Sequence, residues 1–175
     1  PTANTEEWNG SAWTDVSGNL NQARKSLAAA GTRESAVVFG GYGPPYYANT
    51  EVWNGTSFAE DADLNSARNQ LGGAGSSSTS ALACGGNNPA LPSSPSALTE
   101  SWNGTSWTET GDLNTARYAM GSGGTATSAI SMGGEPKTGK TELFDGTSWT
   151  EVTDMNTARQ TVGGAATNNT SGIAC

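Results

Sequence analysis

The sequence predicts an all-β fold made of four similar units, each with four short strands. Three observations predict it: one sequence motif recurs four times along the 175 residues, glycine is abundant at 24 residues, and charged residues make up only 14% of the sequence. This composition fits many short strands and tight turns better than a helical core. Self-similarity at a fixed period is typical of repeat architectures, so the repeat decides the fold.

Each copy of the repeat contains two aromatic positions on either side of a turn. The copies are TEEWNGSAWTD from Thr5, TEVWNGTSFAE from Thr50, TESWNGTSWTE from Thr99 and TELFDGTSWTE from Thr141. Asn-Gly, or Asp-Gly in the last copy, is the strongest short-range signal for a hairpin. We therefore expect two antiparallel strands in which the aromatic side chains face each other and stabilise the hairpin.

Two further elements complete each unit. A phrase of the form LNxAR or MNTAR ends at Arg24, Arg68, Arg117 and Arg159. An apolar run follows and ends in a glycine doublet, as in ALACGG, whereas the last run, GIAC, stops at Cys175. In the second unit we expect strands at 68–75, 80–84, 98–102 and 107–110. The first of these is rich in glycine and alanine, which permits close approach around a central axis.

Four strands in roughly 45 residues, repeated, are typical of propeller blades. The glycine doublet and the aromatic residue of the fourth strand resemble the kelch repeat over nearly the whole chain. The WNGTSW sequence motif is similar to repeats in virion structural proteins of tailed phages. These resemblances imply a β-propeller and a structural or interaction role.

The order of strands predicts how the chain ends meet. The chain begins just before a third strand and ends after a second strand, so the two end pieces together make one blade. We expect a single domain over 1–175: a β-propeller of four kelch-like four-stranded blades, with one blade shared between the N- and C-termini. The units are 19–60, 64–110, 113–152, and a shared blade from 1–18 plus 155–175. Sharing would remove exposed strand edges. The alternative is a fragment of a larger ring or repeat array.

Repeated charges predict structural ion pairs. The four arginines are half of the eight basic residues, and each unit also has a glutamate just before its first aromatic position. The first and third strands start at the same end of a blade, so these charges can meet there. A ligand usually needs one site, whereas packing requires the same contact in every unit. Because these charges recur in every unit, a structural role is favoured over a charged ring that binds a ligand. The residues are Arg24, Arg68, Arg117 and Arg159 with Glu6, Glu51, Glu100 and Glu142.

The loops between the second and third strands differ most among the units. They read YGPPYYAN from Tyr42, NNPALPSSPSA from Asn87 and EPKTGK from Glu135. Variable loops on a rigid scaffold are where binding usually resides, and tyrosine suits contact with glycans or proteins. The alternative is sequence drift in exposed loops. The candidate ligand-binding residues are Tyr42, Tyr46, Tyr47, Asn87, Asn88 and Lys137.

Composition argues against several function classes. The net charge of −8 disfavours nucleic-acid partners, and no apolar stretch has the length of a membrane span. Histidine is absent, so the commonest general base and metal ligand is lacking. We expect no metal site and no cofactor. Cys84 and Cys175 occupy the same place in their units, and we expect both to be buried apolar fillers.

The expected function is a non-enzymatic structural or interaction module of a phage virion or surface appendage, located in the virion or outside the cell. Its partners are then other proteins, including virion components, and a homo-oligomer is compatible with the sequence. The first alternative is a lectin-like propeller that binds surface glycans. A glycosidase is less favoured because it requires a dedicated carboxylate pair, and no nucleophile with a partner base stands out.

Overall fold

The computed structural model describes all residues except 91–93, and the described residues form sixteen strands and no helix. None of them therefore forms a helix long and apolar enough to cross a membrane. The strands are β1 Glu6–Trp8, β2 Trp13–Asp15, β3 Ala28–Gly31, β4 Ala36–Phe39, β5 Thr50–Trp53, β6 Phe58–Asp61, β7 Gly72–Ser77, β8 Ser80–Cys84, β9 Thr99–Trp102, β10 Trp107–Glu109, β11 Gly121–Thr125, β12 Ser128–Met132, β13 Thr141–Phe144, β14 Trp149–Val152, β15 Gly164–Asn168 and β16 Ser171–Ala174.

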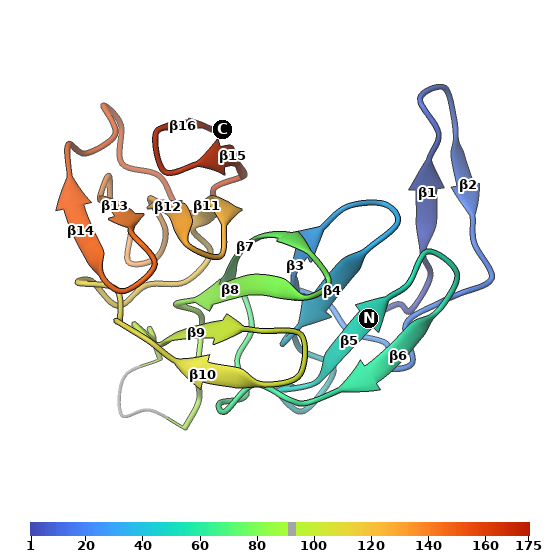
Figure 1. Ribbon diagram of the computed structural model, residues 1–175. Coiled ribbons are helices and arrows are strands. Elements are labelled where there is room, and N and C mark those ends of the chain that lie inside the picture. Colours follow the sequence, from blue (N-terminus) through green and yellow to red (C-terminus); the bar gives the residue numbers. More distant parts are fainter. Residues whose placement is uncertain (91–93) are drawn as a thin grey trace.

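The strands form three four-stranded antiparallel sheets and two separate hairpins. The sheets have the orders β3-β4-β5-β6, β7-β8-β9-β10 and β11-β12-β13-β14, and the hairpins are β1-β2 and β15-β16. The sheets follow one another in an arc, with the two hairpins at its ends (Figure 1). The all-β class and the blade-like sheets predicted from the sequence are confirmed.

The aromatic hairpin has the predicted geometry in every unit. In the second sheet Trp102 and Trp107 are directly opposite, with ring centroids 5.3 Å apart. The Asn103 side chain closes the turn, because its Oδ1 accepts hydrogen bonds from the backbone N–H groups of Thr105 and Ser106, each at 2.9 Å. The turn residue therefore serves the hairpin directly, as short polar side chains do in such turns.

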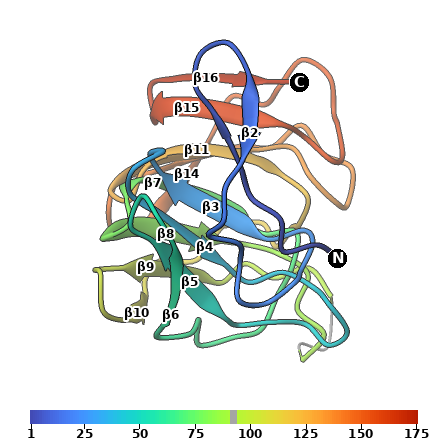
Figure 2. The ribbon, with the colours of Figure 1, turned by 90° about the vertical axis from the view of Figure 1, so that its right-hand side faces the viewer.

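The first strands of successive sheets lie side by side in the middle of the arc. β3 contacts β7, β7 contacts β11, and β11 contacts β15 (Figures 1 and 2). A Cβ atom on Gly73 would lie 2.8 Å from the Ala29 carbonyl oxygen, and one on Gly123 would lie 2.5 Å from the Ala166 nitrogen. These distances are too short for a side chain, which explains why the first strand of each unit is rich in glycine.

A left-handed residue precedes each of these inner strands. Ser26, Gln70, Ala119 and Thr161 occupy the same place in their repeats and have φ of 56°, 51°, 53° and 54°. Such angles are uncommon for residues other than glycine, and they interrupt an extended strand. The strand expected at 68–75 therefore begins later, at Gly72. The turns are also joined, since the Gln70 N–H donates to the Ser26 carbonyl and the Ala119 N–H donates to the Gln70 carbonyl, both at 2.8 Å.

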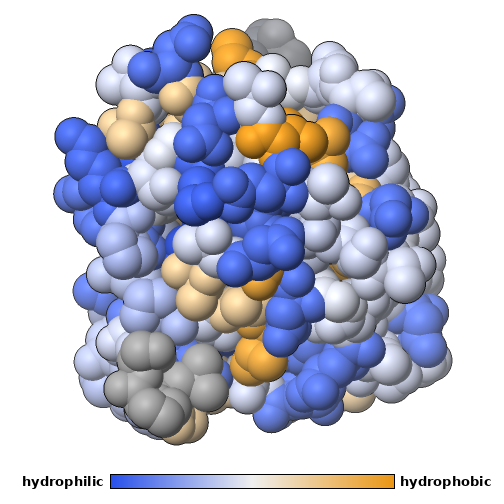
Figure 3. All heavy atoms as spheres, turned by 90° about the vertical axis from the view of Figure 1, so that its left-hand side faces the viewer, coloured by the Kyte–Doolittle hydropathy of each residue, from blue (hydrophilic) through white to orange (hydrophobic). Residues whose placement is uncertain are grey.

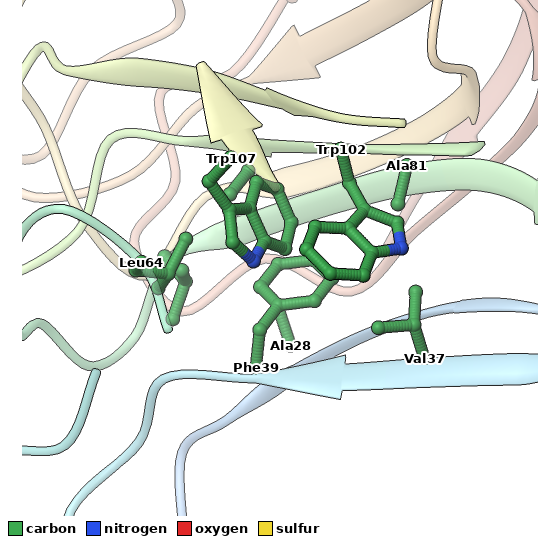
Figure 4. Close-up of a cluster of buried hydrophobic side chains, with 9 residues drawn as sticks. Ala28, Val37, Phe39, Leu64, Ala81, Trp102 and Trp107 are labelled. Carbon is green, nitrogen blue, oxygen red and sulfur yellow. The ribbon is translucent and has the colours of Figure 1, made fainter. Parts of the chain in front are cut away.

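The core lies between adjacent sheets. Trp102 and Trp107 of the second sheet are buried against Phe39 and Val37 of the first, and the ring of Phe39 lies 4.8 Å from that of Trp107 (Figure 4). The Trp107 Nε1–H donates to Thr50 Oγ1 at 2.9 Å, and Trp149 makes the equivalent bond to Thr99 at 3.0 Å. The last strands of the second and third sheets are thus each tied to the sheet before by a buried hydrogen bond as well as by apolar burial.

The shared blade is not formed in this structure. β1 pairs only with β2 and β15 only with β16 among the described residues. The neighbouring sheets cover their apolar side chains only in part, and Trp8, Trp13 and Ile173 are 47%, 66% and 68% exposed. The expectation that Cys175 is buried is wrong for the same reason: it follows the open edge of β16 and is exposed, whereas Cys84 is buried.

Trp102→Ala should lower the free energy of unfolding by about 3–5 kcal/mol, the usual cost of deleting a buried aromatic side chain. Trp102→Phe is the matched control, because Phe144 occupies the equivalent place in the third sheet. It removes the hydrogen bond from Nε1 to the Ser78 carbonyl and part of the buried ring system, but it keeps an aromatic ring in place and should cost clearly less than Trp102→Ala. Urea denaturation followed by circular dichroism measures both, and equal losses in the two variants would contradict the packing described.

Candidate functional site

Three arginines form buried ion pairs with glutamates of the third strands. Arg24 contacts Glu51 at 3.0 Å, Arg68 contacts Glu100 at 2.9 Å and Arg117 contacts Glu142 at 3.0 Å. All six side chains are essentially inaccessible to solvent. Each arginine also donates through a second nitrogen to a backbone carbonyl, that of Asn49, Leu98 or Lys140.

These ion pairs link neighbouring sheets through the connecting segments. In the segment 64–68, the Leu64 N–H donates to the Ala48 carbonyl and the Arg68 carbonyl accepts from Gly41, both in the first sheet's own loop. The Arg68 side chain binds Glu100 in the second sheet. We call such a segment, with the carboxylate that holds it, a clamp. A clamp explains why the charges recur in each repeat.

Burial dominates the electrostatics of a clamp. Loss of hydration lowers the pKa of the Arg68 guanidinium, and the facing Glu100 carboxylate raises it again. Loss of hydration raises the pKa of Glu100, and Arg68 opposes that rise. Removing one partner would leave the other charge buried without compensation, which is far more costly than losing an exposed ion pair.

The fourth expected pair is not formed. Among the described residues, the Arg159 side chain donates only to the carbonyl of Ala174, at 3.1 Å, and makes no salt bridge. Glu6 lies in β1, at the other end of the arc (Figure 1). Both side chains therefore lie at the two open ends of the molecule.

Two of the three variable loops border a hollow on the face where the inner strands begin. This loop-face hollow has a volume of about 340 Å³, and its lining residues are Lys25, Ser26, Tyr42, Tyr46, Asn69, Gln70 and Asn87. Backbone pairs fix its walls, since Lys25 pairs with Tyr42 and Asn69 pairs with Asn87. Ser26 and Gln70 also line a second hollow of about 320 Å³ at the axis, which Leu27, Leu71 and Met120 share. The two hollows are adjacent.

The sequence-predicted loop residues lie in different surroundings. Tyr42, Tyr46 and Asn87 line the loop-face hollow. Tyr47 is tied to its own loop, because its hydroxyl donates to the Gly43 carbonyl at 2.6 Å and accepts from Gln22 at 2.9 Å. Asn88 is buried, and its side-chain oxygen accepts from the Ala90 N–H at 2.9 Å. The residues 91–93 of the same loop lie outside the described part of the chain.

Lys137 is exposed in the third loop and is not among the described residues that line either hollow. The structure adds Lys25, Asn69 and Gln70 to the lining, and none of these was predicted from the sequence. One sequence feature could have indicated two of them: Lys25 and Asn69 directly follow repeated arginines, yet they differ from each other. Variation next to a repeated residue marks a position that the scaffold does not fix.

Among the described residues there is no group of three or more cysteine, aspartate or glutamate side chains arranged to hold a metal ion. In this same part of the chain, no carboxylate lines either hollow. The side of the molecule that carries β14 is largely hydrophilic, with hydrophobic atoms only in small patches (Figure 3). In comparisons with known proteins, the chain matches no family profile and no curated protein sequence.

Arg68→Ala should lower the free energy of unfolding by about 3–5 kcal/mol, because it leaves the Glu100 carboxylate buried without its partner. Arg33→Ala is the control: Arg33 pairs with Glu34 at 2.7 Å, both are exposed, and such a pair contributes little to stability. Thermal and urea unfolding measure both variants. An Arg68→Ala protein as stable as the Arg33→Ala protein would show that the clamp is not structural.

Proposed function

We propose that this chain is a non-enzymatic interaction module of the kind found in phage virions or surface appendages, built as a closed kelch-like propeller. One observation carries the proposal: the clamps hold a repeated scaffold, while two of the three loops that do not repeat meet at one hollow. The WNGTSW resemblance supports the virion setting.

Two charges that make no salt bridge among the described residues, Glu6 and Arg159, support closure of the ring. In the second clamp the Asn65 N–H donates to Glu100 Oε2 at 2.8 Å, while Arg68 binds Oε1 at 2.9 Å. The last connecting segment carries Asn156 and Arg159 in the same places, and β1 carries Glu6. If β1 pairs with β16, Glu6 reaches this position and completes a fourth clamp.

The exposed aromatic side chains support the same pairing. Trp107 and Trp149 each donate to a threonine of the preceding sheet, Thr50 and Thr99. Trp13 has the equivalent place in β2, and its partner in a closed ring is Thr141 of the third sheet. Closure would also cover Trp8, Trp13 and Ile173, and burying exposed apolar surface is favourable by about 25 cal/mol per Å².

Closure predicts a specific disulfide. In the second sheet Ala83 faces Glu100 and Cys84 faces Thr99, so the same register places Cys175 opposite Thr5. Thr5→Cys should therefore form a disulfide with the native Cys175, because facing residues on antiparallel strands lie within the Cα separation of about 4.4–6.8 Å that a disulfide requires. Cys84 should not compete, since burial raises the pKa of its thiol to about 11.

Ser11→Cys, in the exposed turn between β1 and β2, is the control that should not cross-link to Cys175 within one chain. Gel mobility with and without reductant, followed by peptide mapping, measures the bond. In the Thr5→Cys protein, an intramolecular link between the introduced thiol and Cys175 under mild oxidation supports the closed ring. Intermolecular dimers, or no link at all, would contradict closure within one chain.

The virion setting has a separate test. Peptides of this chain should co-sediment with tailed particles purified from the source culture, as identified by mass spectrometry after density-gradient centrifugation. Recovery only in the particle-free fraction would count against a virion component. This result does not depend on whether the ring closes.

A further inference from the structure

We propose that the loop-face hollow binds an uncharged saccharide unit. This inference rests on the proposed function, because it takes the loop face as the binding face and names the ligand class. The hollow lies between the first and second sheets, at the point where the loops containing Tyr42 and Asn87 meet the connecting segments that end in Lys25 and Asn69. Its volume of about 340 Å³ is within the range of small-ligand pockets.

An unpartnered buried oxygen points to a missing donor. Asn69 lines the hollow and is only 9% exposed. Its side-chain Oδ1 is closed off from solvent and accepts no hydrogen bond from the described residues. The backbone of Asn69 is fixed by two bonds with Asn87, at 3.1 and 2.8 Å. Leaving a buried acceptor unpaired is costly, and rotation of the amide toward the hollow would let a ligand hydroxyl satisfy it.

An aromatic corner forms another wall. The rings of Tyr42 and Tyr46 meet edge to face, with centroids 5.2 Å apart and an interplanar angle of 73°. The Lys25 ammonium lies 5.7 Å from the centroid of the Tyr42 ring, which is the range of a cation–π contact. Tyrosine offers an apolar face and a polar tip, which match the C–H face and the hydroxyl groups of a sugar ring.

The remaining lining residues match hydroxyl groups on the ligand. Gln70 and Asn87 each provide an amide, and Ser26 provides a hydroxyl, so donors and acceptors are both present. Lys25 is the only charged residue in the described lining, and the chain carries a net charge of −8. A polyanionic ligand such as a nucleotide would be repelled, whereas an uncharged hydroxyl-rich ring would not.

The site occurs at one place in the repeat, which gives an internal control. The third unit has Tyr118 and Glu135 where the second has Asn69 and Asn87, and they make the same backbone pair, with bonds of 3.1 and 2.8 Å. Glu135 is not among the described residues that line the loop-face hollow. A substitution there changes an equivalent position without touching the proposed site.

The experiment measures binding of glucose, galactose, mannose and N-acetylglucosamine to the full chain by saturation-transfer NMR and calorimetry. At least one should bind, and Asn69→Ala and Tyr42→Ala should each weaken it by about tenfold or more, the effect of losing one good polar or stacking contact, whereas Glu135→Ala should not change it. Asn69→Ala should leave the melting temperature unchanged or higher, because the atom it removes has no partner among the described residues. A structural asparagine would instead lower it.

Three results would overturn the proposal: none of the four sugars binds, Asn69→Ala binds as well as the unaltered chain, or Asn69→Ala lowers the melting temperature and binding together. Selective binding of sialic acid that is lost in Lys25→Gln would overturn the uncharged ligand class. The cross-link to Cys175 and the co-sedimentation with particles require no sugar, so they separate failure of this inference from failure of the proposed function.

Discussion

The buried contact between a guanidinium and a carboxylate is the interaction on which the arrangement of the sheets depends. Arg68 belongs to a segment whose backbone is bonded to the first sheet, and Glu100 belongs to the second. That contact ties the segment to the second sheet through a buried charge pair, beside the bond from Arg68 to the Leu98 carbonyl. Repetition of the contact gives each sheet the same kind of tie to its neighbour, so stability is expected to accumulate from one interface to the next, as in other repeat proteins.

A scaffold fixed in this way leaves few positions free to vary. The inner strands must be small, as the 2.5 Å approach at Gly123 shows, and the hairpin aromatics of the three sheets are largely buried. The residues that follow the arginines and the glycine doublets are not constrained in this way. Lys25 and Tyr42 in one unit are replaced by Asn69 and Asn87 in the next, on identical backbone pairs. The same backbone arrangement thus presents different side chains at the surface of each unit.

Much of the fold could be predicted from local signals. Asn103-Gly104 between Trp102 and Trp107 specifies a hairpin and its register, and both follow from adjacent residues. The hollow could not be predicted, because it depends on long-range geometry. A left-handed conformation at Gln70 is not expected for glutamine, and the unpaired oxygen of Asn69 exists only in the folded chain. Tyr47 shows the converse. The sequence predicts a ligand-binding loop tyrosine, but its hydroxyl donates to the Gly43 carbonyl of its own loop.

The direction of each clamp has a consequence for assembly during synthesis. Arg24 precedes Glu51 by 27 residues, and Arg68 precedes Glu100 by 32. Each connecting segment therefore leaves the ribosome before the carboxylate that will hold it, and every completed sheet locks the segment made just before it. Translation and assembly run in the same direction along the chain. In the closed ring that we propose, Glu6 and Arg159 would reverse this order, since that carboxylate is made long before its arginine.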